Sequence, residues 1–247
     1  NNTANAVSGM DLGTVPTSWE AKNGDTYGSL KGLVEAAATA EAPVIIELIG
    51  DVVLTEPVKV PATNITINGN DNSISFPGGP AFSNTDAQNL AGIFSNTTLM
   101  VNNVHFISTT ETPQGYAVLI NHDVENTRVT LSSCTFENLY CGVYANQVVT
   151  EGHGAEVTIT GCHYDGTTYG YGLSEVTDGN IINGTKVTFD ASNTSADEGF
   201  VAQEPLSSDI SLTVNGVTTA YNILDAAITA AGENNAVITL NDDITLT

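Results

Sequence analysis

The sequence predicts an all-β fold: a short right-handed parallel β-helix (solenoid) with an N-terminal capping α-helix and a C-terminal helix–strand–strand unit. Two observations support this prediction. A strand–turn–strand pattern returns three times with its apolar residues in the same columns, and the segment that opens the domain is restated at its end. Repeated columns at a near-constant period are typical of a solenoid, because each coil buries its inner face only against its neighbours.

The repeated columns lie in three segments that begin at Leu99, Val129 and Val157, which are 30 and then 28 residues apart. Period-2 alternation in each segment points every second side chain inward, and equivalent inward positions stack at ~4.8 Å from coil to coil. An earlier degenerate copy covers residues 65–76, and residues 186–189 are a candidate later one. The aligned columns are Leu99/Val129/Val157, Val101/Leu131/Ile159, Val104/Cys134/Cys162 and Phe106/Phe136/Tyr164.

A third strand-like piece lies between these segments in each period. The pieces are residues 91–94, 116–120, 141–144 and 171–173, and Asn, Gly and Ser residues are frequent in the corners that separate the strands. These residue types favour turns, because they tolerate left-handed backbone or form local hydrogen bonds. Each period therefore holds about three short strands, as a coil with three sheets requires.

The opening unit begins after residues 1–25, which are polar and aperiodic and are interpreted as a leader or edge segment. A helix is predicted at 28–41, because Leu30, Leu33, Val34 and Ala37 form one apolar stripe and Pro43 ends it. The apolar run at 44–54 predicts two short buried strands around a turn. The β-helix domain is thus assigned to residues 26–205.

Residues 206–247 contain a second copy of this helix–strand–strand unit. Residues Tyr27, Leu30 and Ala36 match Tyr221, Leu224 and Ala230, and after a two-residue shift Ile46, Leu48, Asp51, Leu54 and Thr55 match Ile238, Leu240, Asp243, Leu246 and Thr247. The copy is interpreted either as a C-terminal cap or as the start of the next repeat of a tandem array. Tandem or head-to-tail self-association through residues 213–247 is the corresponding expectation.

The composition restricts the function classes. The net charge is -23, from five Lys and Arg against 28 Asp and Glu. This balance argues against nucleic acid and against anionic membrane surfaces, both of which need basic residues. Membrane insertion is not expected, because no segment reaches the ~18 apolar residues of a membrane span. The Asn-, Thr- and Gly-rich, Lys-poor profile is typical of secreted proteins, so an extracellular location on a bacterial cell surface is expected.

The coil periodicity over about residues 44–205 resembles the pectin-lyase-like superfamily of right-handed β-helices. The opening unit is similar to repeat modules of bacterial cell-surface, adhesin-like proteins. This resemblance implies a non-catalytic extracellular module that binds a glycan or a host or cell-surface protein, or that spaces other domains. Because the superfamily also contains enzymes, the fold alone does not decide the function.

The alternative function is a carbohydrate-active enzyme. The fragments Asn84–Asp86 and Gly152–Gly154 resemble two of the four short motifs of polygalacturonases. The resemblance implies that Asp86 is a catalytic carboxylate and that His153 supports it, in an inverting hydrolysis. The chain lacks the family's adjacent Asp-Asp between these two fragments, and it lacks the family's Arg-x-Lys. A polysaccharide lyase would need Ca²⁺ and a basic residue, and Arg128, the only arginine, is expected to pair with a carboxylate instead.

Candidate binding residues are the tyrosines Tyr140, Tyr144, Tyr169 and Tyr171, which gather around the third strand of two adjacent coils. They either form a stacking surface for a neutral glycan or fill corners as residues of high β-propensity. His105 and His163 alternate with inward positions and are expected to face outward.

No metal or cofactor is predicted. Ca²⁺ is the one alternative, at the carboxylates of the C-terminal third, which otherwise form a solvated acidic face: Asp178, Asp190, Asp197, Glu198, Glu204 and Asp209. The cysteines do not have the spacing of a zinc site. Cys134 and Cys162 are expected to stack as buried thiols, with Cys141 also buried.

Overall fold

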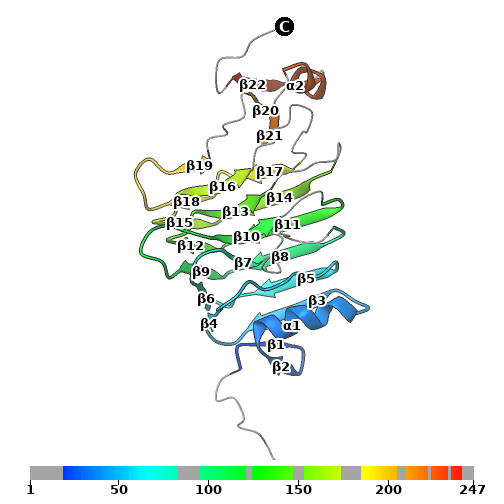
Figure 1. The fold of residues 1–247 in the computed structure, drawn as a ribbon, viewed down its shortest axis with the longest axis vertical. Coiled ribbons are helices and arrows are strands. Elements are labelled where there is room, and N and C mark those ends of the chain that lie inside the picture. The colour runs from blue at the N-terminus through cyan, green and yellow to red at the C-terminus, as the bar shows by residue number, and fades with distance from the viewer. Residues whose placement is uncertain are drawn as a thin grey trace, which may run out of the picture.

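The computed structural model describes a parallel β-solenoid of about four turns, with its long axis vertical in Figure 1. Three sheets form its walls, and the chain runs through them in turn in every coil. The predicted all-β fold and β-helix are therefore confirmed. The described residues are 19–82, 95–120, 124–146, 153–173, 185–204, 210–221, 224–232 and 235–240.

The first sheet has eleven strands and runs the whole length of the described chain. Its middle strands, from β3 to β17, pair in parallel, and its end strands pair antiparallel. Its order is β2 (Thr26–Gly28), β1 (Ala21–Asn23), β3 (Val44–Leu48), β5 (Asn64–Asn68), β8 (Thr98–Asn102), β11 (Thr127–Ser132), β14 (Ala155–Thr160), β17 (Lys186–Phe189), β21 (Val217–Tyr221), β20 (Ile210–Val214) and β22 (Ala236–Leu240).

The second and third sheets are entirely parallel and shorter. The second contains β4 (Val52–Val53), β6 (Ser73–Phe76), β9 (His105–Ser108), β12 (Thr135–Glu137), β15 (His163–Asp165) and β18 (Thr194–Ser195). The third contains β7 (Pro80–Phe82), β10 (Tyr116–Ile120), β13 (Cys141–Ala145), β16 (Tyr169–Leu173) and β19 (Val201–Gln203). The expected third strand at 91–94 lies outside the described residues, and β7 is the third-sheet strand of the coil that contains β5 and β6.

Three of the four predicted columns are observed as registers of paired strands, and the residues of the fourth, Val104/Cys134/Cys162, lie between strands and are all buried. Val129 pairs with Leu99 on one side and with Val157 on the other, and all three are buried. Phe136 pairs with Phe106 and Tyr164, and its ring centroid lies 5.8 Å and 4.8 Å from theirs. One apolar core therefore runs through all coils, with aromatic rings stacked along its axis.

Left-handed residues make the corner between the first and second sheets. Asn103, Ser133 and Gly161 occupy equivalent positions in three coils with φ of 53°, 54° and 62°. The Asn103 amide donates to Ser132 O (2.9 Å) and the Ser133 amide to Thr160 O (3.0 Å), so each corner is hydrogen-bonded to the next coil. Asn and Gly are frequent at such positions because they tolerate positive φ better than other residues.

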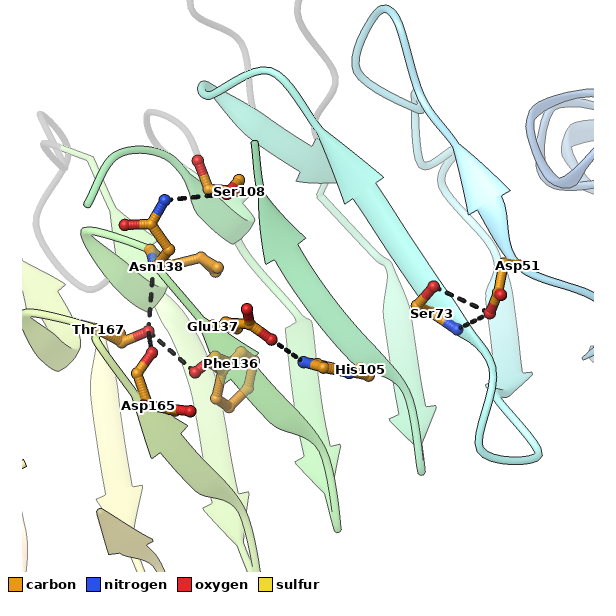
Figure 2. Close-up of polar contacts among 10 residues, drawn as sticks. Asp51, Ser73, His105, Ser108, Phe136, Glu137, Asn138, Asp165 and Thr167 are labelled. Atoms are coloured by element: carbon orange, nitrogen blue, oxygen red, sulfur yellow. Dashed lines mark hydrogen bonds and ion pairs between the residues drawn. The ribbon is translucent and has the colours of Figure 1, made fainter. Parts of the chain in front are cut away.

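The corner after the second sheet is closed by side chains (Figure 2). Asn138 Nδ2 donates to the carbonyl oxygens of Ser108 (3.0 Å) and Thr110 (2.6 Å) in the coil below. The buried Thr167 hydroxyl donates to Phe136 O and accepts from the Leu139 amide. These contacts satisfy backbone groups that the strands leave unpaired where the chain turns.

A hairpin precedes the capping helix at the N-terminal end. Strands β1 and β2 pair antiparallel, and α1 (Leu30–Ala36) continues as the 3₁₀ helix η1 (Ala37–Thr39). Ser29 caps α1, because its Oγ accepts a hydrogen bond from the Gly32 amide (3.1 Å). The helix predicted at 28–41 is confirmed but shorter. Strand β1 (Ala21–Asn23) lies within the segment 1–25, which the sequence assigned to a leader or edge segment, and it lies next to the end strand of the first sheet.

The C-terminal unit is likewise a hairpin (β20 and β21), a helix, α2 (Leu224–Ala231), and a strand, β22. It has a small core of its own, formed by Ile210, Leu212, Tyr221, Ala227 and Ala231. The two ends of the chain that match in sequence thus also have the same order and pairing of structural elements. The hairpins were not predicted.

Replacing Phe136 by alanine removes a fully buried ring from the middle of the stack. We expect Phe136→Ala to lower the free energy of unfolding by about 3–5 kcal/mol, the usual cost of a large cavity. Urea denaturation followed by circular dichroism measures this loss. Thr135→Ala, one residue away and partly exposed, is the matched control, with an expected change within about 0.5 kcal/mol. Equal losses for the two variants would contradict the assigned register.

The three cysteine thiols are free and buried, as the sequence predicted. Hydrogen bonding to Cys162 and burial raise the pKa of Cys134 well above its usual value, and burial and the nearby Glu204 do the same for Cys141. The hydrogen bond with Cys134 lowers the pKa of Cys162, so burial alone protects that thiol. Because thiol reagents attack exposed thiolates, we expect no rapid reaction of the native protein with an aromatic disulfide reagent. All three thiols should react once guanidinium unfolds the chain. A fast native reaction at any of them would refute this prediction.

Candidate functional site

Parallel stacking brings several tyrosines together at the start of the third-sheet strands. Tyr116 begins β10, Tyr140 directly precedes β13, and Tyr169 begins β16. The register pairs Tyr116 with Cys141 and Cys141 with Tyr169, so these positions lie on three successive coils. The repeated position of a tyrosine in the coil therefore creates a row of rings along the solenoid.

Four of the rings form a continuous group, here named the tyrosine cluster: Tyr116, Tyr140, Tyr144 and Tyr169. The centroid of Tyr116 lies 4.8 Å from that of Tyr144 and 6.0 Å from that of Tyr140, and Tyr140 lies 5.5 Å from Tyr169. The Tyr140 ring is nearly perpendicular to both Tyr116 (88°) and Tyr169 (78°). All four residues are partly exposed, so the cluster is accessible to solvent.

A carboxylate borders the cluster. Glu204 follows β19, where its amide donates to Tyr171 O (2.8 Å) and holds the chain against β16. The Tyr140 hydroxyl donates a hydrogen bond to Glu204 Oε1. The cluster thus combines aromatic faces, phenol hydroxyls and one acidic group within a few ångströms.

A glycine provides the space in which Tyr144 and Glu204 meet. A Cβ atom on Gly172 would lie 2.5 Å from Glu204 Oε2 and 2.7 Å from Tyr144 Cδ2. Tyr144 and Gly172 are register partners on β13 and β16. Because Gly172 has no side chain, the Tyr144 ring can lie over this position of β16 in the neighbouring coil.

Burial raises the pKa of two phenol groups of the cluster, those of Tyr116 and Tyr140. It raises the pKa of Tyr116 to about 12, with smaller contributions from neighbouring groups. Burial also raises the pKa of Tyr140, and its hydrogen bond to Glu204 adds to the effect because it stabilises the protonated phenol. Both hydroxyls therefore keep their proton to a higher pH than an exposed tyrosine does, and Tyr140 donates its hydrogen bond to Glu204.

Three of the four tyrosines predicted as binding residues lie in the cluster, and Tyr171 does not. Tyr171 is buried in the core, where its ring packs 6.1 Å from Phe189 and its hydroxyl donates to Gln203 Oε1 (2.8 Å). Sequence reasoning missed Tyr116 and did not place Glu204 at this site. Tyr116 had a signal, because it opens the aligned segment 116–120, whereas the position of Glu204 has none in the sequence.

The residues of the enzyme alternative are only partly described. Asp86 lies outside the described residues, so its position relative to His153 is not established. His153 Nε2 lies 3.7 Å from Glu125 Oε2. Arg128 Nε binds Glu156 Oε2 at 2.7 Å, which confirms the expected pairing with a carboxylate. In the second sheet His105 Nε2 lies 2.9 Å from Glu137 Oε2 (Figure 2), and both side chains are partly exposed.

Two of the carboxylates that were considered for Ca²⁺, Asp190 and Asp197, accept hydrogen bonds at corners. Asp190 accepts from the Ser192 amide (2.8 Å), and hydrogen bonds from Ser192 lower the pKa of Asp190. Asp197 Oδ2 accepts from the Gly166 amide in the neighbouring coil (2.8 Å). Asp178 and Asp209 lie outside the described residues. Within the described ranges, no group of three or more His, Cys, Asp or Glu side chains is arranged to hold a metal ion.

No helix of the described part of the chain is long and apolar enough to span a membrane. Comparisons with protein-family models, curated proteins and solved structures found no match to this chain. The argument for function therefore rests on the chemistry of the chain's own surface.

Gly172→Ala tests the close approach at the cluster. The new methyl group must displace the Tyr144 ring, so we expect a loss of about 1–3 kcal/mol in the free energy of unfolding. Chemical denaturation measures the loss, and tyrosine fluorescence reports the displaced ring. Gly50→Ala is the matched control, because its nearest contact would be an ordinary 3.8 Å. Two variants of equal stability would contradict the packing described.

Proposed function

We propose that this chain is a non-catalytic extracellular β-helical module of a bacterial surface protein, with the tyrosine cluster as its glycan-binding surface. The observation that supports this function best is the row of four partly exposed rings beside Glu204. Aromatic faces stack on the apolar faces of sugar rings, and hydroxyl and carboxylate groups bind sugar hydroxyls. The resemblance to adhesin-like modules of the pectin-lyase-like superfamily is part of the same proposal.

The charge of the chain favours a neutral glycan over an acidic one. Five basic residues stand against 28 acidic ones, so an anionic polysaccharide would be repelled by the protein's field. The group nearest to the cluster is itself a carboxylate, Glu204. A neutral sugar can donate a hydrogen bond to Glu204 Oε1 and accept one from the Tyr116 phenol, whereas the Tyr140 phenol already donates to Glu204.

The spacing of the cluster suits an extended ligand. Its members come from three successive coils, so their rings repeat along the solenoid axis. A linear oligosaccharide lying along that axis would contact several rings at once. The contribution of each ring is small, so we expect weak binding that is strengthened when several modules act together.

The binding test uses a panel of neutral oligosaccharides on an array, followed by calorimetric titration with any that bind. We expect Tyr144→Ala to weaken binding by about 3- to 10-fold, the value of one aromatic contact. Tyr140→Phe, which keeps the ring and loses the hydrogen bond to Glu204, should have a smaller effect. Tyr27→Ala is the control, because Tyr27 is exposed and packs beside Trp19 instead.

Two results would overturn the proposal. Equal weakening by Tyr144→Ala and Tyr27→Ala, or no binding to any neutral glycan, would remove the cluster as a binding surface. Turnover of polygalacturonate that Asp86→Ala abolishes would replace the non-catalytic module with the enzyme alternative.

A further inference from the structure

The two ends of the first sheet carry the same unit (Figure 1). At the N-terminal end, the hairpin of β1 and β2 is followed by α1 and by β3, which pairs antiparallel with β1. At the C-terminal end, β20 and β21 are followed by α2 and by β22, which pairs antiparallel with β20. Leu48 pairs with Ala21 in one unit, and its sequence match Leu240 pairs with Ile210 in the other.

The units differ in what lies on the far side of their last strand. The free edge of β3 pairs in parallel with β5, with Ile46 opposite Ile67. The equivalent edge of β22 ends the sheet within the described residues. The second unit therefore presents an open parallel edge where the first unit carries a coil.

The exposed fractions of matched side chains also differ between the two units, and they show which face of the C-terminal unit has no coil packed against it. Val34 and Leu48 are 0% and 1% exposed, whereas their counterparts Ile228 and Leu240 are 52% and 51% exposed. The outward positions are the internal comparison: Ile45 is 54% exposed and its counterpart Val237 is 63% exposed. The two inward positions are thus far more exposed in the C-terminal unit than in the N-terminal unit, whereas the outward position is similarly exposed in both. The C-terminal unit therefore has the same inward face, but no coil packs against it.

In the N-terminal unit the first coil packs against the inward face. Val34 and Leu48 belong to one continuous core with Val52, Leu54 and Val58, which lie between β3 and β5 in the chain. The group that fits the C-terminal face is thus a strand–turn–strand coil with inward β-branched residues, added in parallel to β22.

The outer strand of the C-terminal hairpin pairs with the coils that precede the unit. Strand β21 pairs antiparallel with β17, the last strand of the preceding coils, with Val187 opposite Thr218. Its counterpart β2 is the first strand of the described sheet. One unit of this type therefore has an edge for a solenoid that precedes it and an edge for a solenoid that follows it.

We propose that the exposed face formed by β22 and α2 is a receiving surface for a further parallel coil with the chemistry of residues 52–82, so that such units join solenoids in tandem. A separate folded copy of the chain does not supply this coil, because its own β3 already pairs with it. In this proposal the coil belongs to the same polypeptide, as the coil that covers the N-terminal unit does. This proposal is independent of what the tyrosine cluster binds.

The experiment extends the full chain from Thr247 with a second copy of residues 56–204. The match of Thr55 with Thr247 sets the register of the extension. Hydrogen–deuterium exchange should then show β22 amides exchanging at least about a hundredfold more slowly than in the original chain, together with protected strands in the appended copy. Small-angle scattering should show a longer particle of unchanged cross-section.

Paired variants of the extended chain separate docking from simple tethering. Leu240→Asp places a charge on the inward face and should abolish the protection of both β22 and the appended copy. Val237→Asp, on the outward face, should leave that protection in place. The same variants in the original chain report any general loss of folding, which is expected to be small because both side chains are exposed there.

Two outcomes would overturn the proposal. One is an appended copy that exchanges at unfolded rates while residues 19–204 stay protected. The other is an appended copy that folds while β22 keeps its original exchange rate, or while Leu240→Asp and Val237→Asp have equal effects. Either result would identify the C-terminal unit as a cap that accepts no coil.

Discussion

In-register stacking of inward apolar side chains is the interaction on which the rest of this structure depends. Each coil is too thin to enclose a core of its own, so Val129 is buried only because Leu99 and Val157 lie directly on either side of it. A one-residue slip would turn these side chains outward and place polar neighbours inside. The columns must therefore persist from coil to coil, and this constraint makes the repeat visible in the sequence.

The same constraint leaves the outward positions free to vary, and the candidate site uses that freedom. The tyrosine cluster lies on strands whose core side chains are ordinary β-helix residues, so its rings add a surface without changing the core. Parallel pairing then aligns equivalent outward positions of neighbouring coils. Tyr116, Tyr140 and Tyr169 are far apart in the chain but become neighbours because each lies at the start of the third strand of its own coil or directly before it.

Much of the fold could be predicted from the sequence, because columns and corners are local patterns that repeat. The site was less predictable. Tyr169 and Tyr171 have the same side-chain type and lie two residues apart, yet one is at the surface and the other is in the core. Both residues lie on β16, and period-2 alternation assigns them to the same face, so alternation cannot separate them. Glu204 reaches the cluster through the pairing of β19 with β16, which sequence separation hides.

The hairpins of the terminal units were missed for a related reason. Strands β1 and β2 have three residues each, too few for an alternation pattern, and they are held by pairing with β3 and by α1.

Once both units are seen, the burial of their matched residues becomes informative. Leu48 and Leu240 have the same residue type and equivalent pairing partners, and only the presence of a coil separates their exposures. Two hydrophobic side chains half exposed on the inward face of one unit, Ile228 and Leu240, oppose the usual burial of such residues. A unit whose sole role was to end a solenoid would place polar residues there, as terminal caps of repeat proteins do. The retention of apolar residues at the matched inward positions is therefore better explained by a unit that connects solenoids than by one that terminates them.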